Sequence, residues 1–130
     1  MVRAQSAETP YLTSFTNGIH RGSADNTSDK GGQGNGFRPH ELLEAALASC
    51  INVWLRMYAD HHQVPLEGVS TAVALKRDQP GVTVFAYEID LQGPLTSEQK
   101  GKLLEIAQTC PVRKTLSGAL SFSAAATARQ

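Results

Sequence analysis

The chain has 130 residues, of which 41% are hydrophobic and 18% charged, which is enough apolar material for one folded domain. Basic and acidic residues balance at 12 each, so no charge excess favours nucleic acid as a partner. No apolar run is long enough for a membrane span or a signal core, and together with only two cysteines this predicts a cytoplasmic protein.

Residues 1–38 form the N-terminal part of the predicted domain, with short strands followed by a glycine-rich connector. Residues 11–16 alternate in β-favouring types, and Asn17-Gly18 predicts a hairpin turn into a returning strand at 19–24. The connector over 25–38 lacks the Walker and dinucleotide-binding glycine patterns. A plain loop and a flap that orders over a site both remain open for it.

Residues 39–62 carry the strongest helical signal in the chain. Pro39 suits the first helical position, and Glu41 lies in an early turn where the helix dipole favours negative charge. Apolar side chains recur at three- and four-residue steps and would share one face. These residues are Leu43, Ala46, Leu47, Cys50, Val53, Trp54 and Met57. We therefore predict a central helix whose apolar stripe forms core, part of which could line a substrate pocket beside Cys50.

Residues 68–126 are predicted to supply the rest of the domain. Two alternating segments, 69–76 and 82–91, flank a Pro-Gly turn and predict an antiparallel hairpin. Thr96 with Gln99 fits a capping box, which opens an amphipathic helix ending near Thr109. This element order predicts an α+β fold with antiparallel sheets.

The segment after the second helix carries the other cysteine. Pro111 ends that helix and suits the first position of a new short one, so Cys110 would lie where a helix begins. Free N–H groups there, with Arg113 and Lys114 nearby, are expected to stabilise a thiolate. Residues 119–124 are expected to form a closing strand.

Two cysteines, each on or beside a helix, fit a two-thiol peroxide cycle, in which one thiol is oxidised to sulfenic acid and the other condenses with it. A metal site is the competing use, but Cys50 and His61 lie too far apart along one helix to share an ion. No metal or cofactor is expected. A purely structural role for both cysteines remains an alternative, because buried thiols are commonly inert.

Two motifs resemble the OsmC/Ohr family. They read PHELLEAALASC, followed by LRMYA, and CPVRKTL, and the resemblance spans roughly residues 18–126. It implies a single OsmC-like domain over 1–130, with antiparallel sheets around a long cysteine-bearing helix. It also implies an intertwined homodimer with active sites at the subunit interface.

The resemblance further implies thiol-dependent reduction of organic hydroperoxides in oxidative-stress defence. Cys50 would attack the peroxide, Cys110 would resolve it to a disulfide, Arg21 would activate the site and Glu41 would orient Arg21. A dithiol, in some family members on a lipoylated protein, would be the reductant. The proposed pocket residues are Leu47, Val53, Trp54 and Met57.

Three positions depart from the family pattern in its best-studied branch. His40 stands where that branch has its key glutamate, and Glu41, one place later, would face away from Cys50 on its own helix. Arg113 replaces a frequent motif histidine. The alternative hypothesis is therefore a non-catalytic binding or redox-sensing dimer with little peroxidase activity.

Overall fold

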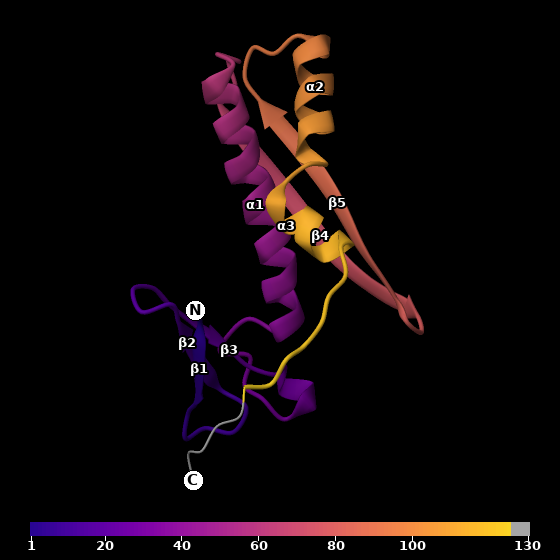
Figure 1. The fold of residues 1–130 in the computed structure, drawn as a ribbon. Coiled ribbons are helices and arrows are strands. Elements are labelled where there is room, and N and C mark those ends of the chain that lie inside the picture. Colours follow the sequence, from indigo (N-terminus) through magenta and orange to yellow (C-terminus); the bar gives the residue numbers. More distant parts are fainter. Residues whose placement is uncertain (126–130) are drawn as a thin grey trace. The chain divides into compact units, whose positions relative to one another are not determined.

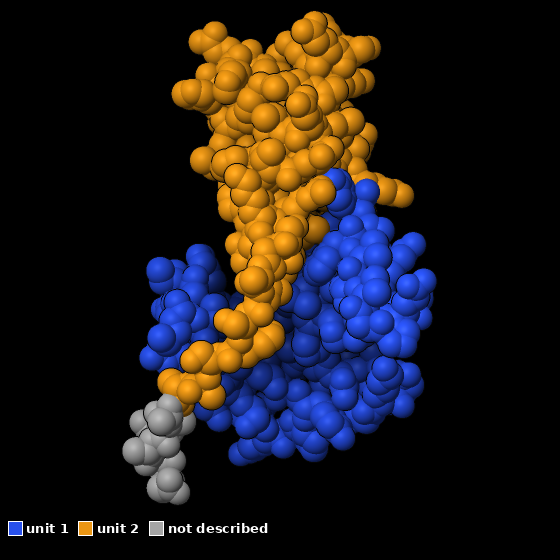
Figure 2. All heavy atoms as spheres, turned by 45° about the vertical axis from the view of Figure 1, so that its right-hand side comes forward, with its two compact units in different colours: residues 1–46, 73–87 blue, residues 47–72, 88–130 orange. Residues whose placement is uncertain are grey.

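The computed structural model describes residues 1–125 (Figure 1). These residues form two compact units (Figure 2). Unit 1 comprises residues 1–46 and 73–87, and unit 2 comprises 47–72 with the described part of 88–130. The long helix and both strands of the long hairpin each contribute residues to the two units. The mixture of helices with antiparallel sheets confirms the predicted α+β fold.

Unit 1 begins with a three-stranded antiparallel sheet in the order β1-β2-β3. Its turn between β2 and β3 is the predicted Asn-Gly turn, where Asn17 Oδ1 accepts the backbone N–H groups of Ile19 and His20 at 2.9 and 2.8 Å. Gly18 has φ +99°, a conformation that favours glycine. The strands are β1 (Arg3–Ser6), β2 (Thr13–Thr16) and β3 (Arg21–Ala24).

Helix α1 (Pro39–His61) confirms the predicted central helix to within one residue of its end. Its buried residues recur at four-residue steps, namely Leu47, Ile51, Leu55 and Ala59. The prediction that the apolar stripe forms core is wrong for Leu43, Val53 and Met57, which are 43%, 59% and 56% exposed. Ala46 of the same stripe is exposed as well. The apolar surface of α1 is wider than the face that this chain covers, so part of it remains open to solvent.

Strands β4 (Gly68–Gln79) and β5 (Val82–Gln92) form a two-stranded sheet, as the alternating segments predicted. In unit 1, Glu44 of α1 accepts the N–H of Leu75 at 2.7 Å. In unit 2, Asn52 donates to the carbonyl of Val69 at 3.2 Å and accepts the hydroxyl of Thr71 at 2.6 Å. These polar side chains of α1 fix β4 against the helix because each satisfies a group on the strand.

Unit 2 also contains the helices α2 (Ser97–Ala107) and α3 (Pro111–Ser117), which follow the hairpin. The predicted capping box is present at the start of α2. The Thr96 hydroxyl accepts the backbone N–H of Gln99, and the Gln99 side chain accepts the backbone N–H of Thr96. Leu103 and Ala107 of α2 are fully buried in the core of this unit.

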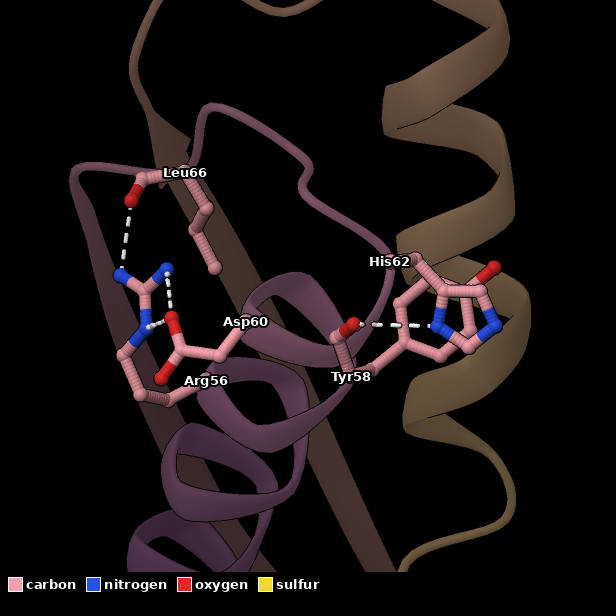
Figure 3. A network of polar contacts seen from close by, with 5 residues as sticks. All are labelled: Arg56, Tyr58, Asp60, His62 and Leu66. Atoms are coloured by element: carbon pink, nitrogen blue, oxygen red, sulfur yellow. Dashed lines mark hydrogen bonds and ion pairs between the residues drawn. The ribbon is translucent and has the colours of Figure 1, made fainter.

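The end of α1 is held by a network of polar contacts in unit 2 (Figure 3). Arg56 donates to the carbonyl of Leu66 at 2.7 Å and forms an ion pair with Asp60 at 2.9 Å. His62 stacks on Tyr58 with ring centroids 4.1 Å apart, and its Nδ1 lies 3.2 Å from the Tyr58 carbonyl oxygen. Histidine is favoured near a helix C-terminus, where its side chain can interact with the last carbonyl groups.

The closing strand expected at 119–124 is wrong, since these residues have no regular structure in the described chain. Leu120 and Phe122 are 56% and 97% exposed. A strand needs the hydrogen-bonding groups of a neighbouring strand, and its alternating pattern alone does not supply one. Residue 126, where the predicted C-terminal region ends, lies outside the described residues.

Within residues 1–125, no helix combines the length and the apolar character required to cross a bilayer.

Candidate active site

The structure brings the two cysteine thiols together within unit 2. Cys50 is half-buried on α1, and Cys110 is fully buried in the turn between α2 and α3. The Cys50 thiol lies close enough to Cys110 to influence its ionisation, and the two cysteines are free rather than bonded to each other. The spacing of the two cysteines in the sequence could not establish this proximity.

The backbone around Cys110 fixes the position of its thiol. Cys110 is the N-cap of α3 with Pro111 at the first helical position, as predicted. Its N–H donates to the Ala107 carbonyl at 3.4 Å, and its carbonyl accepts the N–H of Lys114 at 3.1 Å. Cys110 therefore bridges the last turn of α2 and the first turn of α3.

The protonation of Cys110 differs from what the sequence indicated. Burial raises the pKa of the Cys110 thiol, and the nearby Cys50 thiol raises it further. The backbone N–H of Arg113 and the charge of its guanidinium act in the opposite direction without overcoming burial. The expectation of a stabilised Cys110 thiolate is therefore wrong. It considered the helix start and the nearby cations, but not the desolvation of the buried thiol, which disfavours the charged form.

A second link ties the Cys110 turn to the Cys50 helix. Trp54, one helical turn after Cys50, donates its indole N–H to the Thr109 hydroxyl at 2.9 Å. That hydroxyl donates in turn to the Ile106 carbonyl at 2.7 Å. Trp54 was predicted only as a core or pocket residue, and the sequence held no sign of this hydrogen bond.

Trp54→Phe should loosen this link while keeping most of the aromatic surface. We expect a loss of about 1 kcal/mol in the free energy of unfolding, measured by urea denaturation, because one hydrogen bond disappears. The rate of Cys50–Cys110 disulfide formation should also fall. Tyr58→Phe is the matched control, since the new ring retains the stacking on His62. Unchanged stability and disulfide rate in Trp54→Phe would show that the link does not position Cys110.

The four residues predicted for a substrate pocket lie in different surroundings. Trp54 and Met57 line a small apolar cavity of about 210 Å³ in unit 2, together with Ile106 and Thr109. Leu47 is buried in the core, and Val53 is exposed. A larger apolar cavity of about 540 Å³, which the sequence did not indicate, lies in unit 1 between the β1-β2-β3 sheet and the first turn of α1.

Arg21 and Glu41 both belong to unit 1, and no hydrogen bond or ion pair joins them in residues 1–125. Arg21 is exposed on β3, where its backbone pairs with Thr16. Glu41 accepts the backbone N–H of Arg38 at 2.8 Å and lies 3.6 Å from its guanidinium. The carboxylate of Glu41 thus caps the start of α1, a role typical of the third helical residue.

Among the described residues, no group of three or more His, Cys, Asp and Glu side chains lies close enough to hold a metal ion.

Comparisons with known proteins identify relatives of the chain. The family model described as OsmC-like protein matches residues 32–124. A putative osmotic stress induced and detoxification response protein from Psychrobacter arcticus is similar in structure, with a TM-score of 0.73 and 22% identity over 88% of this chain and 85% of that one.

Two further solved structures share the fold. An OsmC-like protein from Mycoplasma pneumoniae has a TM-score of 0.76 and 17% identity, covering 91% of this chain and 86% of that one. A structure from Legionella pneumophila, named an organic hydroperoxide resistance protein OsmC, has a TM-score of 0.65 and 21% identity, covering 91% and 88%. No curated protein sequence matches the chain.

Proposed function

Because the chain belongs to the OsmC-like protein family, we propose that it reduces organic hydroperoxides through a cycle of its two cysteines. The proximity of the Cys50 and Cys110 thiols within unit 2, close enough for one to affect the ionisation of the other, is the observation that carries this proposal. A buried cysteine with only a packing role does not require a second thiol within reach. Mass analysis of the protein after exposure to one equivalent of hydroperoxide tests the cycle, since it detects a cross-link between Cys50 and Cys110.

Cys50 is the proposed peroxidatic residue because it is the more accessible thiol of the pair. Its thiolate attacks one peroxide oxygen, the O–O bond breaks, and the alkoxide leaves and takes up a proton to become an alcohol. Cys50 is then a sulfenic acid. The Cys110 thiolate attacks the Cys50 sulfur, an S–S bond forms, and hydroxide departs and is protonated to water.

A dithiol completes the cycle by reducing the disulfide while it is itself oxidised. The balance is one hydroperoxide and one dithiol consumed for one alcohol, one water and one oxidised dithiol. The roles of two further residues in this scheme stay predictions. Arg21 would be the cation that activates the peroxide, and Glu41 would be the carboxylate that orients Arg21. The apolar cavity at Trp54 and Met57 supports an organic rather than an inorganic peroxide.

The pH dependence of the second step follows from the raised pKa of Cys110. The attacking species is the thiolate, so at neutral pH only a small fraction of Cys110 is reactive. The rate of disulfide formation should therefore keep rising as pH passes through and beyond the ordinary range of thiol pKa values. Trapping Cys50 sulfenic acid with dimedone at pH 6 and pH 9 checks this, and more trapped adduct is expected at pH 6.

Equal trapping at the two pH values would contradict the assignment of buried Cys110 as the resolving thiol. Cys110→Ser is the reference variant in the same experiment. Its sulfenic acid should persist at both pH values, because no second thiol is present to remove it.

We also propose that the protein is a homodimer that covers the open apolar side of α1. Leu43, Val53 and Met57 on this helix are 43%, 59% and 56% exposed. Monomeric proteins rarely leave a row of large apolar side chains on one helix open to water. A second copy of this chain would cover these side chains, and a charged substitution at Val53 should separate the two copies.

The second candidate function is a non-catalytic binding or redox-sensing dimer. The capping of α1 by Glu41 favours it, since a carboxylate held by Arg38 is not available to orient Arg21. Peroxide and a general thiol oxidant such as diamide distinguish the two functions. A sensor without peroxidase activity would form the disulfide with diamide but would not turn over cumene hydroperoxide.

A further inference from the structure

Met57 is an oxidisable sulfur on the same side of α1 as Cys50. At 3.6 residues per turn, the two residues differ by only about 20° in direction and lie about 10 Å apart along the helix axis. Both belong to unit 2. The Met57 side chain is 56% exposed, so its thioether is not sealed in a core, where methionines are most often found. A hydroperoxide on this side of α1 therefore meets a thioether as well as a thiol.

Met57 also lines an apolar cavity that suits the organic part of a hydroperoxide. The cavity has a volume of about 210 Å³, and its other lining residues include Trp54 and the stacked rings of Tyr58 and His62 (Figure 3). An apolar cavity of about 150 Å³ is enough to bind benzene in another protein. A small aryl or alkyl hydroperoxide would therefore be held beside the Met57 side chain. Hydrogen peroxide would not be held, because it has no apolar part.

The reaction of a thioether with a hydroperoxide needs no other reagent. The sulfur lone pair attacks the terminal peroxide oxygen, the O–O bond breaks, and the proton of that oxygen passes to the departing alkoxide. One thioether and one hydroperoxide thus become one sulfoxide and one alcohol. The sulfur is oxidised and the peroxide is reduced, so the step balances without an external oxidant or reductant.

Oxidation would change the character of the helix surface around Met57. A methionine side chain is apolar and flexible, whereas its sulfoxide is polar. Val53, one turn earlier on α1, is 59% exposed and belongs with Met57 to the apolar side that the proposed dimer covers. Between the apolar side chains of two copies, the sulfoxide oxygen would lose its water, which disfavours association.

We propose that Met57 is a modification site for organic hydroperoxides, and that its sulfoxide weakens the association of two chains. This rests on the proposed function and on the proposed dimer. Association is reversible, so Met57 is accessible whenever the chains separate, and its sulfoxide then keeps them apart. The cysteines react first, because a thiolate is the stronger nucleophile, and Met57 is oxidised once they are consumed.

Oxidation rates test whether the cavity directs a peroxide to Met57. The wild-type protein, below its dimer dissociation constant, is mixed with N-acetylmethionine as a fully accessible thioether, and excess cumene hydroperoxide or hydrogen peroxide is added. Peptide masses give the rate of oxygen gain at Met57 relative to N-acetylmethionine. This ratio should be at least about fourfold higher for cumene hydroperoxide, the effect of burying about one methylene group of its organic part. Equal ratios for the two peroxides would overturn Met57 as a site for organic hydroperoxides.

Sedimentation velocity of the same protein before and after oxidation tests the effect on the dimer. The dimer dissociation constant should rise at least about tenfold, because a polar group is buried without hydrogen bonds. Met57→Leu keeps the apolar volume but has no sulfur, so the same treatment should leave its dissociation constant unchanged. An equal rise in Met57→Leu would assign the dissociation to the oxidised cysteines and overturn the role of Met57.

Failure of this inference is distinguishable from failure of the proposals on which it rests. A protein whose cysteines do not turn over peroxide fails the proposed function, whereas the oxidation rate at Met57 still decides whether this residue is a modification site. A wild-type protein that is monomeric at all concentrations overturns the dimer and the effect of the sulfoxide on it. A dimer that is equally tight with fully oxidised Met57 overturns the effect of the sulfoxide alone.

Discussion

Cys50→Ser should reduce hydroperoxide turnover by more than about a thousandfold, because the hydroxyl that replaces the thiol cannot attack a peroxide oxygen at neutral pH. Ser differs from Cys in one atom, and Cys50 is half-buried rather than at the centre of the core. The free energy of unfolding should therefore change by less than about 1 kcal/mol. Steady-state turnover of cumene hydroperoxide with a dithiol, together with urea denaturation, measures both effects.

Cys110→Ser is the matched variant for this experiment. It should still consume the first equivalent of peroxide at Cys50 and then stop, since the resolving thiol is absent. Cys50→Ser should therefore consume no peroxide and Cys110→Ser one equivalent, and this difference distinguishes the peroxidatic from the resolving cysteine. Full turnover in Cys50→Ser, or no first equivalent in Cys110→Ser with an intact fold, would contradict the assignment.

Val53→Asp should dissociate the proposed dimer. Val53 is 59% exposed on the apolar side of α1, so a carboxylate there is well solvated in one chain and the chain still folds. In a dimer the same carboxylate would be buried without a partner, which costs about 3 kcal/mol and weakens association about a hundredfold. Sedimentation velocity over a range of concentrations measures the change in the dimer dissociation constant.

The control for this variant places the same charge elsewhere. Ser97→Asp adds a carboxylate at the exposed start of α2, where the helix dipole favours it, and should leave the association unchanged. A wild-type protein that is monomeric at all concentrations would contradict the proposed dimer. So would a Val53→Asp variant that dimerises as tightly as the wild type.

The elements that the sequence predicted well are those specified by neighbouring residues. Pro39 with Glu41 opened α1, Thr96 with Gln99 opened α2, and Asn17-Gly18 formed the expected turn. Each signal acts within one helical turn or one hairpin, so the rest of the chain does not override it. For the same reason Cys110 lies at the start of α3 as Pro111 indicated.

The features that the sequence missed depend on contacts between distant segments. Periodicity placed Val53 on the apolar side of α1 but could not say which part of that side this chain covers. The helix start predicted a low pKa for Cys110, while burial by the rest of unit 2 raises it. The sequence did not indicate that Asp25 is buried and accepts hydrogen bonds from the backbone N–H groups of Gln33 and Asn35. Only the path of the folded backbone brings these residues together.

One measurement tests the central claim most directly. The fully reduced protein is exposed to one equivalent of cumene hydroperoxide for seconds and quenched, and intact and peptide masses are then recorded. The two-cysteine cycle predicts a loss of two hydrogens and a cross-link between the peptides that contain Cys50 and Cys110. Two unmodified thiols after this exposure would contradict the cycle and leave the binding or sensing function as the account of this site.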